Sequence, residues 1–191
     1  MAYIGRYNSS NIVDLKSPVS VDGVSIIGSG GTISNATLDS SVTFPDGTII
    51  QQEYVEYVTY EEFTNNTPTS ISGFSKTITL KKTNSKLFIY LFLSGAGKKD
   101  SSTALSVKIT ESVTSLDQTV TDIIAFTNST AYISDSAMQF YVHDHGQSAG
   151  TTLTYTPKFH SSANSSKAFI NNYYSSPQTN TKSYLLLQEV S

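Results

Sequence analysis

The sequence predicts an all-β protein, a jelly-roll-like antiparallel sandwich that carries an extended N-terminal arm. Beyond residue 47, the chain of 191 residues consists of short segments rich in Tyr, Phe, Val, Ile and Thr, separated by polar turns. About nine of these segments have the length and alternation of strands. No stretch shows a 3.6-residue apolar period with helix caps, which favours a sandwich over an α/β fold.

A turn separates the two parts of the chain at Phe44, Pro45, Asp46 and Gly47. Pro45 supplies the φ of the first central position of a turn, Asp46 tolerates the bridge region, and Gly47 accepts a positive φ. Upstream of this turn, apolar residues are too sparse to build a core. We therefore expect an extended arm over residues 1–47 and one sandwich head over residues 48–191.

Within the arm, Val19–Ile27 alternates apolar with small or polar residues around Asp22-Gly23, which predicts a strand or short hairpin. Gly28–Gly31 follows as a flexible joint. An arm of this composition cannot bury its own apolar side chains. It is expected to drape over the head, to wind with copies of itself, or to dock into another protein.

In the head, Lys86–Ser94 is a nearly continuous apolar run, typical of a central strand covered on both faces. Its side chains alternate, so one set should form a core layer and the other should face another layer or a neighbouring subunit. The first set is Leu87, Ile89, Leu91 and Leu93, and the second is Phe88, Tyr90 and Phe92. Pro157 should confine its strand to an edge or a bulge. The other predicted strands are Ile49–Tyr60, Ser75–Leu80, Leu105–Ile109, Val120–Phe126, Met138–Val142, Leu153–Phe159, Lys167–Tyr173 and Ser183–Val190.

Composition excludes several function classes. The net charge of −3 and the lack of a long basic run argue against nucleic-acid binding. The apolar run from Leu87 to Leu93 is too short for membrane insertion, and the chain has no cysteine. Charged residues make up only 14% of the chain, against about 25% in an average domain. A surface so poor in charge is expected to be covered partly by partners.

Two groups of side chains are candidates for a site. His143 and His145 would share one face of a strand, as the His-x-His pairs of cupins do, but no Glu follows at the position that completes such a metal site. A polar strand end is therefore the favoured interpretation, and we expect no metal or other cofactor. Tyrosines could stack on sugars if exposed, or they could fill the sheet faces or a subunit interface, and this second interpretation is favoured. These tyrosines are Tyr54, Tyr57, Tyr132, Tyr141, Tyr173 and Tyr174.

Gly30–Gly47, followed by Gln51, resembles a segment of tail-fibre-like structural proteins of marine phages, including cyanophages and pelagiphages. The N-terminal segment Met1–Gly5 and the C-terminal segment Ser183–Val190 are similar to the corresponding ends of the same proteins. The family commonly has Pro-Ala-Gly-His at the turn, whereas this chain has Asp46 and Thr48 in place of Ala and His. The turn geometry should survive these changes, although any role of the His is lost. The resembling motifs cover about a quarter of the chain, and the rest is similar in being rich in β-strand residues, Ser and Thr.

The resemblance implies a non-enzymatic virion protein, such as a tail-fibre, head-fibre or decoration protein. Residues 1–47 would dock to other virion proteins and the jelly-roll head would form a homotrimer on the particle surface or tail. Two alternatives remain open at this point. One is a carbohydrate-binding or receptor-binding module at a fibre tip, with a host surface glycan as partner. The other is a cupin-like metalloprotein that uses His143 and His145.

Overall fold

In the computed structural model the chain divides into two units, Met1–Thr43 and Phe44–Ser191, each described here by itself. The structure describes residues 19–21, 24–27, 45–120, 130, 132–173, 176–177 and 181–191. Phe44, Tyr174, the Gly28–Gly31 joint and most of the predicted strand Val120–Phe126 lie outside the described residues. In the first unit, β1 (Val19–Val21) pairs antiparallel with β2 (Val24–Ile27), so the predicted hairpin is present.

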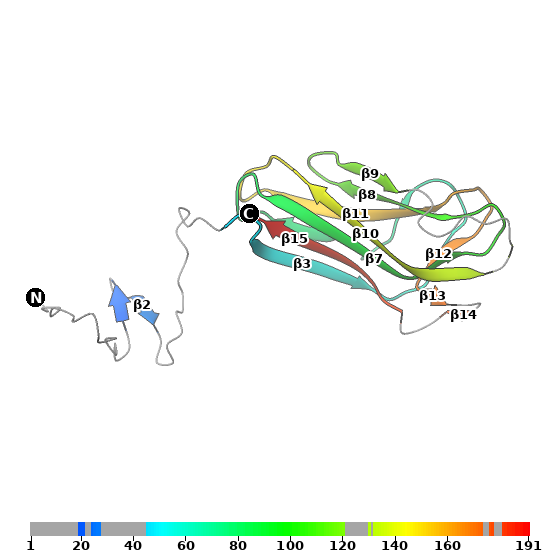
Figure 1. The fold of residues 1–191 in the computed structure, drawn as a ribbon, viewed down its shortest axis with the longest axis horizontal. Helices are drawn as coiled ribbons and strands as arrows, with labels where there is room; N and C mark the ends of the chain where they lie inside the picture. Colours follow the sequence, from blue (N-terminus) through cyan, green and yellow to red (C-terminus); the bar gives the residue numbers. More distant parts are fainter. Residues whose placement is uncertain are drawn as a thin grey trace, which may run out of the picture. The chain divides into compact units, whose positions relative to one another are not determined.

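The second unit is an all-β antiparallel sandwich of two sheets (Figure 1). The first sheet places β3 (Ile49–Tyr57), β15 (Ser183–Val190), β7 (Lys86–Lys98) and β10 (Ile133–His143) side by side. The second sheet places β6 (Lys76–Thr79), β11 (Thr152–Ser161), β8 (Leu105–Glu111) and β9 (Asp117–Val120) side by side. Short strands extend the sheets or pair locally: β4 (Glu61–Phe63), β5 (Thr69–Ser70), β12 (Ala168–Ile170), β13 (Asn172–Tyr173) and β14 (Ser176–Pro177).

The order of the eight main strands is that of a jelly roll. Counted along the chain, the first sheet holds the first, eighth, third and sixth of these strands, and the second holds the second, seventh, fourth and fifth. Each neighbouring pair is antiparallel. Two interlocked Greek keys of this kind define the jelly roll. The fold class expected from the sequence is therefore confirmed by the hydrogen-bonding pattern itself.

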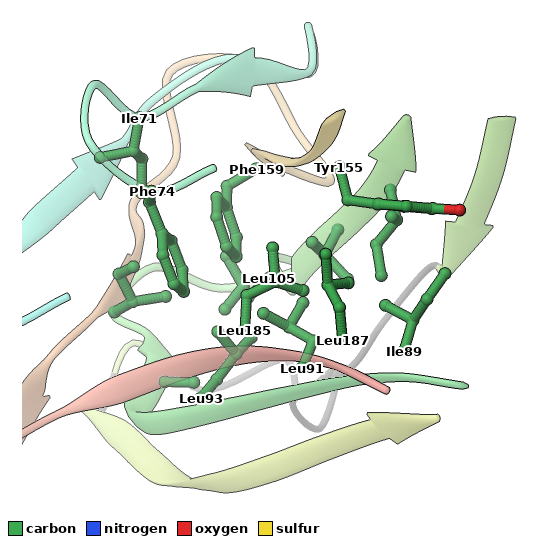
Figure 2. Packing of buried hydrophobic residues seen from close by; sticks show 14 of the residues in the cluster. Ile71, Phe74, Ile89, Leu91, Leu93, Leu105, Tyr155, Phe159, Leu185 and Leu187 are labelled. Carbon is green, nitrogen blue, oxygen red and sulfur yellow. The ribbon is translucent and has the colours of Figure 1, made fainter. Parts of the chain in front are cut away.

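The core lies between the two sheets (Figure 2). Leu87, Ile89, Leu91 and Leu93 of β7 are fully buried, as predicted. They meet side chains of the second sheet and the loops that lead to it, and the set includes Phe74, Leu105, Tyr155 and Phe159. Leu185 and Leu187 of β15 complete the same layer. Because strand side chains alternate between faces, β7 and β15 contribute alternate residues to this core.

Strand β7 is central, as predicted, because it pairs with β15 on one side and β10 on the other. Within one chain, the expectation that both its faces are covered holds for the inner face alone, which leaves a neighbouring subunit as the predicted cover of the outer face. Phe88, Tyr90 and Phe92 lie on the outer side of the first sheet, where they are half-buried by neighbours on the same sheet. No further layer of the described residues covers them, because an antiparallel sandwich covers one face of each sheet.

Strand β11 corrects a second expectation. It is an interior strand, paired with β8 on one side and with β6 and β5 on the other. On that second side the pairs with β6 end at Tyr155 and those with β5 begin at Lys158, so Pro157 lies in the gap between two short strands. The missing N–H of proline is tolerated where no neighbouring strand requires it. Pro157 therefore has no strand neighbour on one side, as a residue of an edge strand would, although β11 itself is an interior strand.

Several strands are longer or shorter than predicted, and two of these differences have a clear local cause. Strand β7 continues past Ser94 to Lys98, through Gly95 and Gly97, which leave room for the backbone of neighbouring segments. The predicted strand Lys167–Tyr173 is broken into β12 and β13 by Asn171, which has φ +56°. Strand β15 has the predicted bounds Ser183–Val190. The described part of the chain contains no helix long and apolar enough to cross a membrane.

Candidate functional site

The hinge turn is fastened to the last residue of the chain. Thr48 N donates to Pro45 O at 3.1 Å, which makes Asp46 and Gly47 the central residues, with φ +85° at Gly47. A positive φ at the second central position is that of a type II turn. Pro45 is therefore the first residue of the turn, one position before the expected one. Gly47 N donates to Ser191 O at 3.1 Å, and the Ser191 hydroxyl donates to Pro45 O at 2.6 Å. The turn consequently belongs to the head.

His143, the last residue of β10, is buried within a chain of hydrogen bonds. Its Nδ1 lies 2.6 Å from the Tyr155 hydroxyl, and its Nε2 lies 3.2 Å from Thr114 Oγ1. The Thr114 hydroxyl donates to the Glu111 carboxylate at 2.6 Å. Because this carboxylate only accepts, the Thr114 oxygen accepts from Nε2–H of His143, which leaves Nδ1 to accept from Tyr155. The network therefore suits a neutral imidazole with its proton on Nε2.

His145 takes part in a second chain of the same kind. Gln147 N donates to His145 Nδ1 at 3.0 Å, and Nε2 lies 3.4 Å from the Ser85 hydroxyl. Ser85 in turn donates to the buried Glu189 carboxylate at 2.6 Å. Glu189 also accepts from two backbone N–H groups of the turn between β6 and β7. Each histidine is thus linked through one hydroxyl to one buried carboxylate.

The pKa values follow from burial. Removal from water lowers the pKa of both His143 and His145, although the charges of Glu111 and Glu189 oppose that effect. At Glu111, burial alone would raise the pKa, but hydrogen bonds from Thr114 and the following backbone outweigh it and the pKa is lowered. Burial raises the pKa of the Tyr155 hydroxyl. The network therefore suits neutral imidazoles, with the Glu111 carboxylate held ionised by its hydrogen bonds.

The two imidazoles do not converge on a common point. Their ring centroids are 6.0 Å apart with an interplanar angle of 80°, and each ring is engaged by its own hydrogen-bond chain. Asp144 between them is exposed. Among the residues that the structure describes, no group of three His, Cys, Asp or Glu is placed to hold a metal ion. The geometry is that of a structural polar network at one end of the sandwich.

Glu111 and Glu189 were not singled out by the sequence analysis, although a signal exists. Glu111 continues the inward series Leu105, Val107 and Ile109 of β8. Glu189 continues the corresponding inward series of β15. An acidic residue at an inward strand position is costly to bury unless it is hydrogen-bonded, so parity alone marks both as members of a buried polar network.

Two of the predicted tyrosines point into the sandwich rather than outward. Tyr57 stacks on Phe74 with ring centroids 5.3 Å apart, and its hydroxyl donates to Glu61. Burial, together with that carboxylate, raises the pKa of Tyr57 to about 12. Tyr141 packs against the core from β10, and burial raises its pKa. Neither residue forms part of an outward-facing site.

The remaining tyrosines are dispersed. Tyr132 is half-buried against Phe169, with their ring centroids 5.6 Å apart. The Lys99 ammonium lies 5.3 Å from the centroid of the Tyr132 ring. Tyr54 is exposed on the outer side of β3. Tyr173 lies in β13, but its side chain is outside the described residues, as is Tyr174. The structure therefore does not bring the predicted set together at one surface.

A different group gathers on the outer side of the first sheet, here called the outer aromatic face. Cross-strand pairs align Tyr54, Leu186, Tyr90 and Phe140 in one row across β3, β15, β7 and β10. Met138 is 65% exposed and Phe140 is 46% exposed. The outer aromatic face consists of Tyr54, Phe88, Tyr90, Phe92, Met138, Phe140, Val142, Tyr184 and Leu186.

The outer side of the second sheet is chemically opposite. Thr77 pairs with Thr154 and Thr79 with Thr152, and both pairs are joined by hydroxyl hydrogen bonds. Lys108 and Lys158 lie opposite each other further along. A shallow hollow of about 360 Å³ lies beside these lysines and is lined largely by polar side chains. This face is suited to water, whereas the outer aromatic face is not.

Together the strand order and these two faces define a jelly-roll protein with one polar and one apolar outer surface. No protein-family model matches the chain, and no curated protein matches it. Among solved structures, the chain is similar to the subviral particle of infectious bursal disease virus VP2, with 14% identity and a TM-score of 0.40. That match covers 92% of this chain and 45% of the VP2 chain.

Proposed function

We propose that this protein is a non-enzymatic structural component of a phage virion: a tail-fibre, head-fibre or decoration protein at the particle surface or tail. Residues 1–47 attach it to other virion proteins, and the jelly-roll head self-associates as a homotrimer. The jelly roll is a fold that viral capsid proteins use, and lectins and cupins use it as well. The choice among these uses rests on the hinge and on the resemblance of Gly30–Gly47 to marine phage fibre proteins.

The observation that carries the proposal is the clamp between the hinge and the C-terminal residue. Pro45, Gly47 and Thr48 are all hydrogen-bonded to Ser191, so the chain enters the head at a fixed point. The residues before that point form a unit of their own, Met1–Thr43. A self-contained head with a separate leading segment suits a protein that is held by one part and exposed by the other.

The test is incorporation of a truncated chain into particles. A phage whose gene lacks codons 2–40 should produce a folded head that is absent from purified particles, whereas the full-length protein should be present. The Thr77→Asp variant of the full chain serves as the matched control and should still be incorporated, because Thr77 lies on the polar outer face. Absence of the full-length protein from particles would overturn the virion assignment. Incorporation of the truncated form would remove the attachment role of the arm.

A further inference from the structure

The two outer surfaces of the sandwich differ in a way that requires an explanation. Threonine and lysine cover the second sheet, yet nine aromatic or aliphatic side chains form the outer aromatic face of the first. In the three rows that cross the face, the one charged side chain is Glu56, and Lys182 pairs with it at 2.7 Å. A contiguous apolar surface on a soluble domain usually marks an interaction site.

The composition favours a protein partner over a sugar. Tyr, Phe and Met are the residues enriched in the buried centre of protein interfaces, while Lys, Glu and Asp are depleted there. The rings are also not coplanar: Phe88 meets Phe140 at 85°, and Tyr90 meets Phe140 at 37°. Two rings at a steep angle cannot both lie flat against one face of a polysaccharide. Met138, the most exposed member, adapts its shape readily to an opposing surface.

The size of the face suits association between domains. Taking about 150–250 Å² for each aromatic side chain, the outer aromatic face leaves about 600 Å² of apolar surface open. A stable interface buries about 800 Å² on each partner, with a polar rim around an apolar centre. Gln52 and Gln188, which lie opposite each other beside the face, supply part of such a rim. The face is thus close to the area that one partner contributes.

We infer that the outer aromatic face is the surface through which copies of this chain bind one another. The inference deepens the proposed function, because it rests on the self-association of the head and assigns a surface to it. A second copy fits because the face is apolar and its one charge is already paired, so the faces of neighbouring copies can pack together around an axis without repulsion. Around a common axis, the faces of three copies would turn inward and their Thr-rich faces would remain in water.

The first experiment measures the mass of the full chain by sedimentation at about 10 μM, a concentration at which a specific interface of this area is expected to hold. The wild-type chain should sediment as an oligomer of the 20.7 kDa protomer. Met138→Asp and Phe140→Asp should weaken association by about 30-fold or more, as central interface substitutions do. Thr77→Asp adds the same charge to the opposite outer face and should leave the mass unchanged.

The second experiment tests the outer aromatic face without weakening the association between copies. The chain has no cysteine, so Met138→Cys introduces a single thiol in the outer aromatic face. A short bismaleimide should join copies of this variant covalently, because symmetry brings the faces together. Thr77→Cys, the matched control, should remain uncrosslinked. Both variants are scored only as folded protein, verified by a cooperative melt at the wild-type temperature.

Each outcome decides the inference. A charged variant that dissociates, together with selective crosslinking at position 138, supports it. A wild-type chain that is monomeric, a Met138→Asp variant that stays oligomeric, or crosslinking through position 77 instead would overturn it. A monomer that binds another protein or a glycan through this face would also overturn it. Incorporation into particles is measured separately, so the virion assignment can stand when this inference fails.

Discussion

The Tyr155 hydroxyl and His143 Nδ1 lie 2.6 Å apart inside the sandwich, joining β11 of one sheet to the end of β10 of the other. The contact suits a neutral imidazole, in which Nδ1 accepts a hydrogen bond from the tyrosine hydroxyl. Glu111 and Thr114 complete the network from the side of β8. The sheets are therefore linked at this end by polar contacts as well as by apolar packing, and the link responds to pH.

The first prediction concerns acid. Burial lowers the pKa of His143, His145 and His160 below the ordinary value of 6.5. As the pH falls below 6.5, the unfolded chain therefore binds protons before the folded one, and the free energy of unfolding decreases. We expect urea midpoints to fall progressively between pH 7 and pH 5. The double variant His143→Gln/His145→Gln should show a shallower pH dependence in that window, with His160 retained. An unchanged dependence would show that these imidazoles are not held neutral.

The second prediction concerns Glu189, which is completely buried and accepts hydrogen bonds from Ser85, from Gln51 and from backbone N–H groups. Glu189→Leu removes the acceptor of the Lys81 and Lys82 N–H groups and leaves Ser85 and Gln51 with one acceptor each, Lys82 O and Thr79 O. The free energy of unfolding should fall by about 3 kcal/mol or more, since each unsatisfied donor costs about 1–3 kcal/mol. Glu53→Leu removes a partly exposed ion pair with Lys76 and serves as the control; it should cost less than about 1 kcal/mol. Equal losses for the two would contradict the network.

The third prediction concerns the core layer of β7. Leu91 is fully buried, and it lies opposite Leu185 of β15 and Gln139 of β10. Leu91→Ala should lower the free energy of unfolding by about 2–5 kcal/mol, because a cavity opens between the sheets. Val58→Ala, at a side chain 45% exposed, should change it by no more than about 0.5 kcal/mol. Thermal and urea melts measure both, and a Leu91→Ala variant as stable as the wild type would show that this layer is not central.

The fourth prediction concerns Gly97. A Cβ at this position would lie 2.1 Å from Ile133 O and 2.7 Å from the Phe169 ring. Gly97→Ala should therefore cost at least about 1–3 kcal/mol, as overpacked sites do. Gly73→Ala is the matched control, because a Cβ there meets nothing within 4 Å and the only cost is the backbone strain of an alanine at φ +81°. That strain is about 1–2 kcal/mol. A larger loss of unfolding free energy for Gly73→Ala than for Gly97→Ala would mean that β7 and β10 can move apart at Gly97 with little cost.

The sequence alone predicts much of the fold because strand alternation is a local property. Met138, Phe140 and Val142 share one face of their strand by parity, and in the structure all three point outward. Parity also groups Leu87, Ile89, Leu91 and Leu93 on one face of β7, and it groups Glu111 and Glu189 with the apolar residues that alternate along their strands. It cannot say which face of a strand meets the core, nor which strands become neighbours, because those depend on partners far along the chain.

What the sequence by itself determined is the all-β class, the hairpin at Val19–Ile27, the turn at Pro45–Gly47 and the strand Ser183–Val190, all set by residues within a few positions of one another. Only the tertiary structure decided that the turn is held by Ser191, that Pro157 lies inside an interior strand, and that Tyr57 and Tyr141 point inward. It also gathered the outer aromatic face from four strands, among which β3 (Ile49–Tyr57) and β15 (Ser183–Val190) lie near opposite ends of the head sequence. The physical reason is register: cross-strand pairing between distant segments determines which side chains become neighbours, and pairing is settled by the whole sandwich rather than by any one strand.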